Sequence, residues 1–158
     1  MIGEKLHIRR YESGDLESVL RLHEAGLREM GTLIEIPGFY DDLLDIEGEY
    51  LDGDGEFLVG VSDGQIVAMG ALKETLPGRA EVKRTRVAPD YRRLGFGQKI
   101  LDALHRYAAG HGYTTLHLDT GVGHGAAQKL YEANGYKETR RGKVGPVDCI
   151  FYERSILA

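Results

Sequence analysis

Apolar residues recur along the chain with two spacings, and clusters of Gly, Pro, Asn and Asp separate the segments in which each spacing holds. Alternating apolar and polar positions are typical of half-buried strands, whereas apolar residues at every third or fourth position are typical of amphipathic helices. Strands are therefore predicted over residues 6–11, 57–61, 66–72, 80–87, 114–120, 136–141 and 148–156. Helices are predicted from Ser13 or Asp15 to Leu27, over 40–50, from Gly95 or Gly97 to Gly110, and over 126–133.

This order of strands and helices predicts an α+β fold. The turn 62–65 joins two strands as an antiparallel hairpin, Pro89 ends the fourth strand, and residues 29–38 lack either spacing and are expected to form a loop. No internal repeat or linker interrupts the chain, and its 158 residues fit one domain over residues 1–158.

Composition excludes a disordered or fibrous chain, because 42% of the residues are hydrophobic and 28% are charged. Glycine is unusual, with 22 residues, about twice the ordinary usage. Such an excess indicates many turns, or loops in which the backbone approaches a ligand closely.

The net charge of −5 argues against nucleic acid as a partner, since proteins that bind it are usually basic. This charge is distributed unevenly. Residues 29–72 carry eleven carboxylates and no Lys or Arg, whereas residues 73–106 carry nine basic and four acidic residues. The two stretches are expected to form an acidic and a basic part of one protein.

Cys149 is the only cysteine, so no intrachain disulfide is expected. No segment is apolar enough to suggest a signal peptide or a membrane span, and a cytoplasmic location without membrane association is expected. His117 and Asp119 alternate on one strand, but two such residues do not predict a metal site.

A glycine-containing loop precedes the third predicted helix. Arg92, Arg93, Gly95 and Gly97 lie where a strand has ended and a helix begins. Unpaired N–H groups and the positive end of the helix dipole favour a phosphate at such a place, and arginines add charge-assisted hydrogen bonds. The alternative is a tight strand-to-helix turn with solvated arginines.

Two other phosphate-binding motifs do not account for the chain. The P-loop pattern is absent, and a dinucleotide fingerprint is met formally at residues 121–126. Only 32 residues follow Ala126, which are too few for the rest of a dinucleotide-binding fold.

The segment 92–97 instead matches the Arg/Gln-x-x-Gly-x-Gly/Ala signature of the GNAT superfamily of N-acetyltransferases, with Val87 and Pro89 at the expected positions upstream. Downstream, the segment 127–136 resembles the same superfamily's Ala-x-x-Leu-Tyr-Glu-x-x-Gly-Phe/Tyr segment. The resemblance covers nearly the whole chain and implies a GNAT-like single domain, with a mixed central sheet of about seven strands that is splayed in the middle and flanked by about four helices.

The resemblance implies acetyl-CoA as the cosubstrate, with its pantetheine arm in the gap of the splayed sheet and its pyrophosphate on the N–H groups of the glycine loop. His124 stands where many members carry an Asn that binds the pantetheine, so it either keeps that contact, faces the acceptor or lies in solvent. The cofactor-binding residues implied are Thr85, Arg86, Val87, Arg92, Arg93, Leu94, Gly95, Phe96, Gly97, Gln98 and His124.

Catalytic roles also follow from the resemblance. Tyr131 stands where the family often places a general acid beside the departing sulfur, although a tyrosine on a helix face also packs in the core. Glu81 and Asp119 are the candidates for the general base that deprotonates the amine, unless they are paired surface carboxylates. A backbone N–H near Val87 is expected to hold the oxyanion.

The expected activity is direct transfer of an acetyl group from acetyl-CoA to a primary amine; the alternative is a non-catalytic acyl-CoA-binding or regulatory module on the same fold. Ten acids in the segment 29–56 favour a cationic acceptor, namely a polyamine, an aminoglycoside-like compound or a peptide amine. They equally suit a solvated helix face. A homodimer is common among members of the family.

Overall fold

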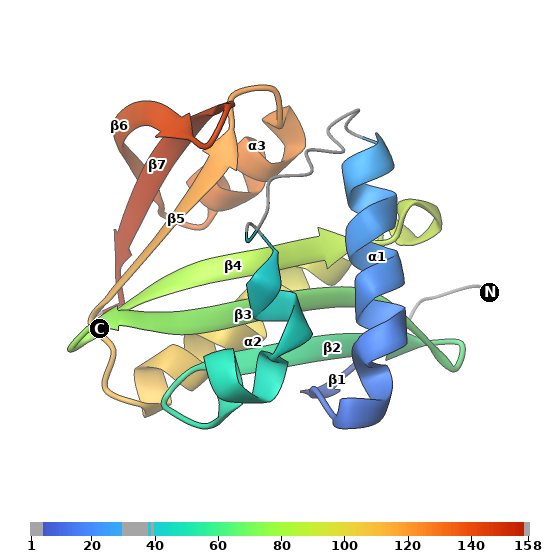
Figure 1. Ribbon diagram of the computed structural model, residues 1–158. Helices are drawn as coiled ribbons and strands as arrows, with labels where there is room; N and C mark the ends of the chain where they lie inside the picture. The colour runs from blue at the N-terminus through green and yellow to red at the C-terminus, as the bar shows by residue number, and fades with distance from the viewer. Residues whose placement is uncertain (1–4, 30–37, 39, 157–158) are drawn as a thin grey trace.

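The computed structural model describes residues 5–29, 38 and 40–156, and its strands form one mixed sheet of seven in the order β1-β2-β3-β4-β5-β7-β6 (Figure 1). All neighbouring strands are antiparallel except β4 and β5, which are parallel. The strands are β1 (His7–Arg10), β2 (Glu56–Ser62), β3 (Gln65–Leu76), β4 (Arg79–Val87), β5 (Thr115–Gly121), β6 (Lys137–Val144) and β7 (Val147–Ser155). The helices are α1 (Leu16–Glu29), α2 (Phe96–Gly110) and α3 (Gly125–Ala133), with short helical turns η1 (Ser13–Asp15), η2 (Asp41–Leu44), η3 (Glu47–Leu51) and η4 (Pro89–Tyr91).

Helices cover the β1–β4 half of the sheet on both faces. In Figure 1, α1 and the η2–η3 segment lie in front of β2, β3 and β4, and α2 lies behind them. Alternation along β3 explains why both faces are apolar: Met69 and Ala71 pack with the α1 side, whereas Ala68 and Leu72 pack with the α2 side. The sheet is therefore the middle layer between two hydrophobic cores.

The sheet divides between β4 and β5. The two strands pair only from Arg79 to Glu81 and from Thr115 to His117, although β4 continues to Val87 and β5 to Gly121. Beyond these pairs β5 runs with β7 and β6 away from β4 (Figure 1). The predicted splay is present, and among the described strands none pairs with the β5-facing edge of β4 after Glu81.

A bulge on β4 lies beside this splay. The register against β3 shifts between the pairs Met69–Arg86 and Ala71–Lys83, and Arg84 has a positive φ of 58°. A bulge adds a residue on one strand and changes the faces to which the following side chains point. Regular alternation along β4 would place Arg84 and Arg86 on the α2 side of the sheet. The bulge instead places both on the α1 side.

The predicted elements are present with shifts of a few residues at their ends, with one structural difference. The helix predicted over 40–50 is two short turns, η2 and η3, separated at Asp45, whose φ of −144° and ψ of 63° are not helical. The Asp45 carboxylate accepts the Gly48 N–H at 3.1 Å, a local hydrogen bond that competes with a continuous helix. The loop predicted over 29–38 lies mostly outside the described residues.

Within the described ranges, none of the helices combines the length and the apolar character needed to cross a membrane.

Candidate active site

The glycine loop between β4 and α2 presents backbone donors at a helix N-terminus. Arg93 and Gly95 both have positive φ values, 61° and 79°, which turn the chain sharply into α2. The first hydrogen bond of this helix runs from the Lys99 N–H to the Gly95 carbonyl at 3.1 Å. The N–H groups of Phe96, Gly97 and Gln98 therefore have no acceptor within the helix. This loop is suited to hold an anion.

The side chains of this loop differ in their exposure and in their contacts. Arg93 is exposed, and Arg92 forms an ion pair with Glu29 at the end of α1. Phe96 is buried against α2-side core residues and stacks on Tyr91 at a ring distance of 6.3 Å, whereas 39% of Leu94 is exposed. Leu94 therefore presents an apolar side chain to a ligand, whereas Phe96 does not.

The Gln98 side chain, which directly follows the segment 92–97, joins α2 to the segment 127–136. Its Nε2 donates to Asn134 Oδ1 at 2.7 Å, and Asn134 Nδ2 donates to Gln98 Oε1 at 2.8 Å. The same Nε2 also donates to Asp102. Any role of Gln98 toward a ligand is thus confined to its backbone N–H, and this link between α2 and the end of α3 was not evident from sequence.

Backbone groups at the end of β4 face the gap in the sheet. The Ala88 N–H donates to the Val67 carbonyl of β3 at 2.7 Å. Because successive N–H groups of a strand point to opposite edges, the Val87 N–H points toward the gap. Thr85 lies two residues earlier on the α2 side, and its buried hydroxyl oxygen has no hydrogen-bond partner of good geometry among the described residues.

Tyr131 reaches the same region from α3. Its side chain is 8% exposed and meets Tyr136 edge-on at a ring distance of 5.7 Å. Burial raises the pKa of the Tyr131 phenol and the Asp119 charge raises it further, while the nearby Thr85 hydroxyl acts in the opposite direction. Tyr131 is therefore both a core residue and a protonated hydroxyl beside the gap.

Glu81 and Asp119 lie on the two strands that separate. Glu81 is the last residue of β4 paired with β5, and Asp119 follows two residues after the last paired residue of β5. Among the described residues neither carboxylate makes a side-chain hydrogen bond or an ion pair. Burial raises the pKa of both carboxyl groups; Lys83 opposes the shift at each, and Asp119 adds to it at Glu81. In the described structure, Glu81 and Asp119 are therefore not paired surface carboxylates.

His124 lies at the N-terminus of α3, and its ring folds back over the end of β5. A Cβ on Gly121 would come within 3.1 Å of the His124 ring, so a side chain there would require the ring to shift by a few tenths of an ångström. Burial and the charge of Arg86 lower the pKa of His124. The ring thus lies against Gly121 within the influence of the Arg86 charge, and the residue is only partly solvent-exposed.

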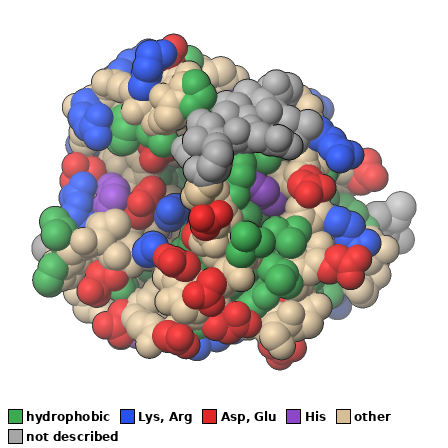
Figure 2. Space-filling view, in the orientation of Figure 1, with side chains coloured by type: hydrophobic (Ala, Val, Ile, Leu, Met, Phe, Trp, Pro, Cys, Tyr) green, Lys and Arg blue, Asp and Glu red, His purple; other side chains and the backbone are tan. Residues whose placement is uncertain are grey.

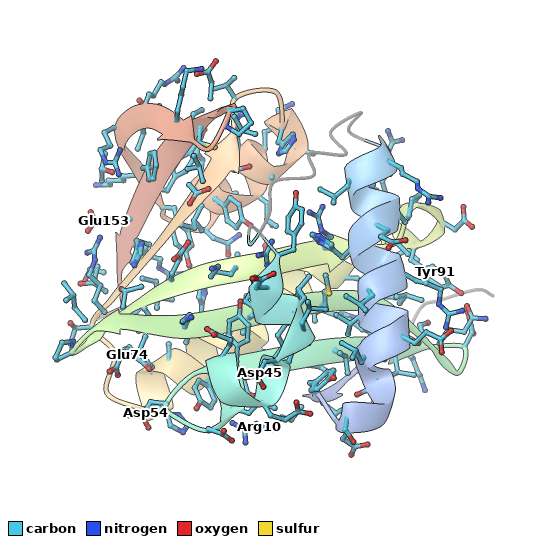
Figure 3. All side chains as sticks on the ribbon, in the orientation of Figure 1. Arg10, Asp45, Asp54, Glu74, Tyr91 and Glu153 are labelled. Atoms are coloured by element: carbon cyan, nitrogen blue, oxygen red, sulfur yellow. The ribbon has the colours of Figure 1, made fainter. Side chains whose placement is uncertain are left out.

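The acidic segment is partly neutralised by contacts within the chain. Asp42 accepts two hydrogen bonds from Arg84, at 2.9 and 2.5 Å, and Glu49 pairs with Lys73. Other carboxylates are exposed and gather over the η2–η3 segment (Figure 2), and Figure 3 places the exposed Asp45 and Asp54 on this segment and just after it, far from α3. Glu35, another acid of the segment, lies outside the described residues.

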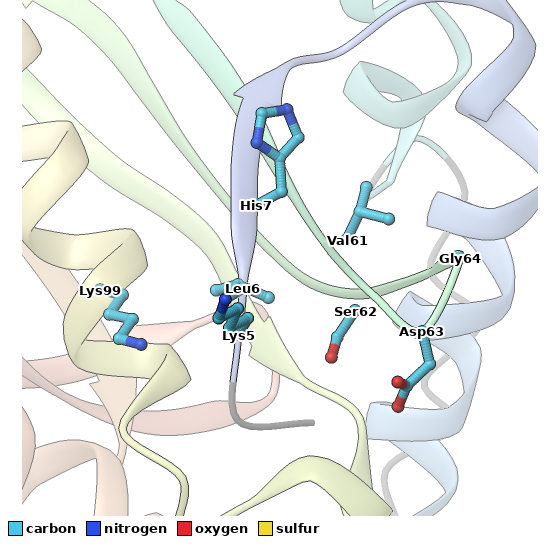
Figure 4. Close-up of a pocket in the computed structure, with 8 residues that line it drawn as sticks. All are labelled: Lys5, Leu6, His7, Val61, Ser62, Asp63, Gly64 and Lys99. Carbon is cyan, nitrogen blue, oxygen red and sulfur yellow. The ribbon is translucent and has the colours of Figure 1, made fainter. Parts of the chain in front are cut away.

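A surface pocket of about 530 Å³ lies elsewhere, beside β1 (Figure 4). It is lined by Lys5, Leu6, His7, the turn 61–64 and Lys99. None of the residues predicted to bind a cofactor or to catalyse lines it. The candidate site is therefore the gap between β4 and β5 with the adjoining glycine loop.

Comparison with known proteins identifies the family. The profile of the acetyltransferase (GNAT) family matches residues 20–136, which include β4, the glycine loop and α3. The chain belongs to the GNAT family. This GNAT protein carries both segments that resemble the family at the gap described above.

Curated relatives are N-acetyltransferases by name. The chain is 28% identical over 143 residues to an uncharacterized N-acetyltransferase of Schizosaccharomyces pombe, covering 89% of this chain and 87% of that protein. It is 33% identical over 103 residues to N-acetyltransferase family 8 member 2 of Rattus norvegicus, covering 62% of this chain and 46% of that protein. The GNAT chain spans about half the length of several curated relatives that it matches.

Solved structures share the architecture. An acetyltransferase of the GNAT family from Staphylococcus aureus Mu50 superposes with a TM-score of 0.90 at 25% identity, covering 97% of this chain and 100% of that one. The ribosomal-protein-S18-alanine N-acetyltransferase of Escherichia coli superposes with a TM-score of 0.76 at 22% identity, covering 96% and 94% of the two chains. The predicted α+β GNAT fold is confirmed.

Membership of the family implies use of acetyl-CoA. The residues present fit this cosubstrate: the N–H groups at the start of α2 suit a pyrophosphate, and the unpaired edge of β4 suits the amides of a pantetheine arm. When bound there, acetyl-CoA supplies the activated acetyl group as a thioester.

Proposed function

We propose that this protein is an acetyl-CoA-dependent N-acetyltransferase that transfers an acetyl group directly to a primary amine. The observation that carries the proposal is the convergence on one gap of three groups: Glu81 and Asp119 from the parting strands and the protonated Tyr131 from α3. A strand edge and a helix N-terminus beside the gap supply the contacts for the cosubstrate.

Two carboxylates with raised pKa values suit the removal of a proton from an ammonium. An amine attacks a thioester only in its neutral form, so a base must take its proton, directly or through one water. Glu81 is the first candidate because it stands at the point where the strands part. Asp119 raises the pKa of Glu81 and is the second candidate.

The leaving thiolate, in contrast, needs a proton donor. The Tyr131 phenol, buried and protonated, donates a proton to the sulfur, and the Val87 N–H stabilises negative charge that develops on the thioester oxygen. The two carboxylates and the phenol thus divide the acid and base roles as their environments dictate.

A cationic acceptor is part of the proposal. Exposed carboxylates of the η2–η3 segment create a negative field in front of the sheet, which favours an approaching ammonium (Figure 2). A polyamine, an aminoglycoside-like compound and a peptide amine all meet this requirement.

The test measures CoA thiol released from acetyl-CoA in the presence of these three classes of amine. We expect Glu81→Gln or Asp119→Asn to lower kcat by about 10²-fold when the residue is the base. The matched control is Glu138→Gln, an exposed carboxylate on β6, which should leave kcat unchanged. Binding of CoA with no thiol release for any amine would instead show a non-catalytic module.

The pH profile provides a second measurement. Since burial raises the pKa of both carboxyl groups, kcat/KM should rise with pH through a pKa above the ordinary range of Asp and Glu. In Glu81→Gln this limb should be lost if Glu81 is the base. An unchanged limb in both single variants would assign the titration to the acceptor amine.

A further inference from the structure

Two arginines of the β4 bulge share one face of the sheet but have different partners. Arg84 is held by Asp42, which also accepts the Tyr50 hydroxyl at 2.6 Å. Arg86 has no carboxylate partner among the described residues, and its buried Nε has no hydrogen-bond acceptor there. A half-buried cation without a counter-ion is costly, and the like charge of Arg84 nearby adds to that cost. The Arg86 guanidinium can therefore donate hydrogen bonds to a bound anion.

Helix α1 is adapted to the Arg86 side chain. Gly26 lies in its interior, where glycine is unfavourable relative to alanine. A Cβ at this position would lie 2.5 Å from Arg86 Nη1 and 3.1 Å from Cζ. The missing side chain leaves room for the guanidinium, so the position of Arg86 is built by two elements.

His23 lies one turn earlier on the same helix and adds polar groups without partners. Its side chain is 4% exposed, and neither ring nitrogen has a hydrogen-bond partner among the described residues. Burial and the charges of Arg86 and Arg84 lower its pKa to about 4, so the ring is neutral and offers one donor and one acceptor. Tyr40 packs edge-on against it at 4.5 Å.

This cluster adjoins the proposed reaction site. The charge of Arg86 acts on both Tyr131 and His124, which border the gap from α3. Arg86 also belongs to the β4 segment whose edge faces the gap. An anionic group bound at Arg86 would thus lie beside the gap that we propose as the reaction site.

We propose that Arg86, with His23 beside it, forms a subsite for a carboxylate of the acceptor, so that the acceptor carries both an ammonium and a carboxylate. The inference rests on the proposed N-acetyltransferase function and narrows its acceptor class. It selects an amino acid or peptide with a nearby carboxylate over a polyamine or an aminoglycoside-like compound, which have none. Guanidinium groups recognise carboxylates through paired hydrogen bonds, which gives the subsite its specificity.

The test compares amines that differ by one carboxylate: lysine with 1,5-diaminopentane, and phenylalanine with 2-phenylethylamine. The protein should have the higher kcat/KM for the carboxylate-bearing member of each pair. Arg86→Gln should lower this preference at least about tenfold, and Arg86→Lys should retain part of it. Comparing ratios between variants cancels the difference in intrinsic reactivity of the two amines.

Two further variants separate the subsite from folding and from cosubstrate binding. Gly26→Ala keeps the charge but displaces the guanidinium, so it should lower the same preference while the unfolding temperature is retained or raised. Arg92→Gln, at the glycine loop, should raise KM for acetyl-CoA and leave the ratio between the paired amines unchanged. An Arg86→Gln variant that behaves like Arg92→Gln would overturn the proposal, because Arg86 would then bind the phosphates of CoA.

A binding measurement makes the inference independent of turnover. In the presence of CoA, N-acetylphenylalanine should bind more tightly than N-acetyl-2-phenylethylamine, and Arg86→Gln should abolish the difference. Equal affinity of the two compounds for the unaltered protein would overturn the carboxylate subsite. Release of thiol with 1,5-diaminopentane but no preference for lysine would also overturn the carboxylate subsite, while the proposed N-acetyltransferase function would stand. If no amine led to thiol release, the N-acetyltransferase function would be refuted, and the binding measurement would still test the subsite.

Discussion

Tyr131 has a hydroxyl beside the gap in the sheet and a ring packed among other aromatic residues. Tyr131→Phe keeps the packing and removes the proton donor, so we expect kcat to fall by about 10²-fold while the affinity for CoA changes little. Thiol release and calorimetric titration with CoA measure the two quantities. Tyr113→Phe, which removes a buried hydroxyl bonded to the Asp54 carbonyl, is the matched control. A parallel loss of kcat and CoA affinity would assign Tyr131 a purely structural role.

His23 gives the free energy of unfolding a defined pH dependence. Its pKa is about 4 in the folded protein against an ordinary value near 6.5, so the unfolded chain takes up the proton first. The free energy of unfolding should therefore be highest above pH ~6.5 and should fall by roughly 1–3 kcal/mol as the pH decreases to ~4. Half-buried His105, with a pKa of about 4, contributes in the same direction.

Urea unfolding between neutral pH and pH ~4.5 measures this dependence. In His23→Gln the dependence should be reduced, because the new side chain does not titrate, and the part due to His105 should remain. A variant whose stability falls with acid as steeply as that of the unaltered protein would show that His23 is not buried neutral.

At the scale of elements, the amide pair between Gln98 and Asn134 fixes the start of α2 against the end of α3. Asn134 Nδ2 also donates to the Leu130 carbonyl at 2.7 Å. Asn134→Ala leaves the Gln98 amide without this partner and should lower the free energy of unfolding by about 1–2 kcal/mol. Lys129→Ala, an exposed change on the same helix, should alter it by less than about 0.5 kcal/mol in a parallel urea titration. Equal stability of the two variants would contradict the link.

Element boundaries were predictable where glycine and proline punctuate the chain, as at Gly64, Gly78, Pro89 and Gly95, three of which have the positive φ that glycine tolerates. The break at Asp45 was not predicted, because apolar spacing alone continued through it. Its cause is a side chain that bonds to the backbone three residues later. Asp and Gly within three residues are a local signal that weighs against a continuous helix.

At the scale of the whole molecule, the glycine loop and Tyr131 could be placed from sequence because each lies in a short, contiguous motif. The Arg86–Gly26 approach joins residues 60 positions apart, and the Arg84–Asp42 pair joins residues 42 apart. Such contacts depend on how α1 and the η2–η3 segment pack over β4, which no local pattern contains. The uneven charge along the chain was also only a partial guide, because folding pairs Lys73, Arg79, Arg84 and Arg92 with carboxylates.

The basic residues that folding does not pair with carboxylates determine how KM for acetyl-CoA depends on salt. Arg93 at the glycine loop is exposed and makes no ion pair among the described residues, so its attraction for phosphate is screened by ions. KM for acetyl-CoA should rise several-fold between about 0.05 and 0.5 M NaCl, as the screening length shortens. Arg93→Gln should raise KM at low salt and flatten this dependence. Arg106→Gln, an exposed change in the middle of α2, should leave both unchanged. Equal salt dependence in all three proteins would mean that backbone N–H groups, and not the loop's arginine, dominate the attraction for the phosphates.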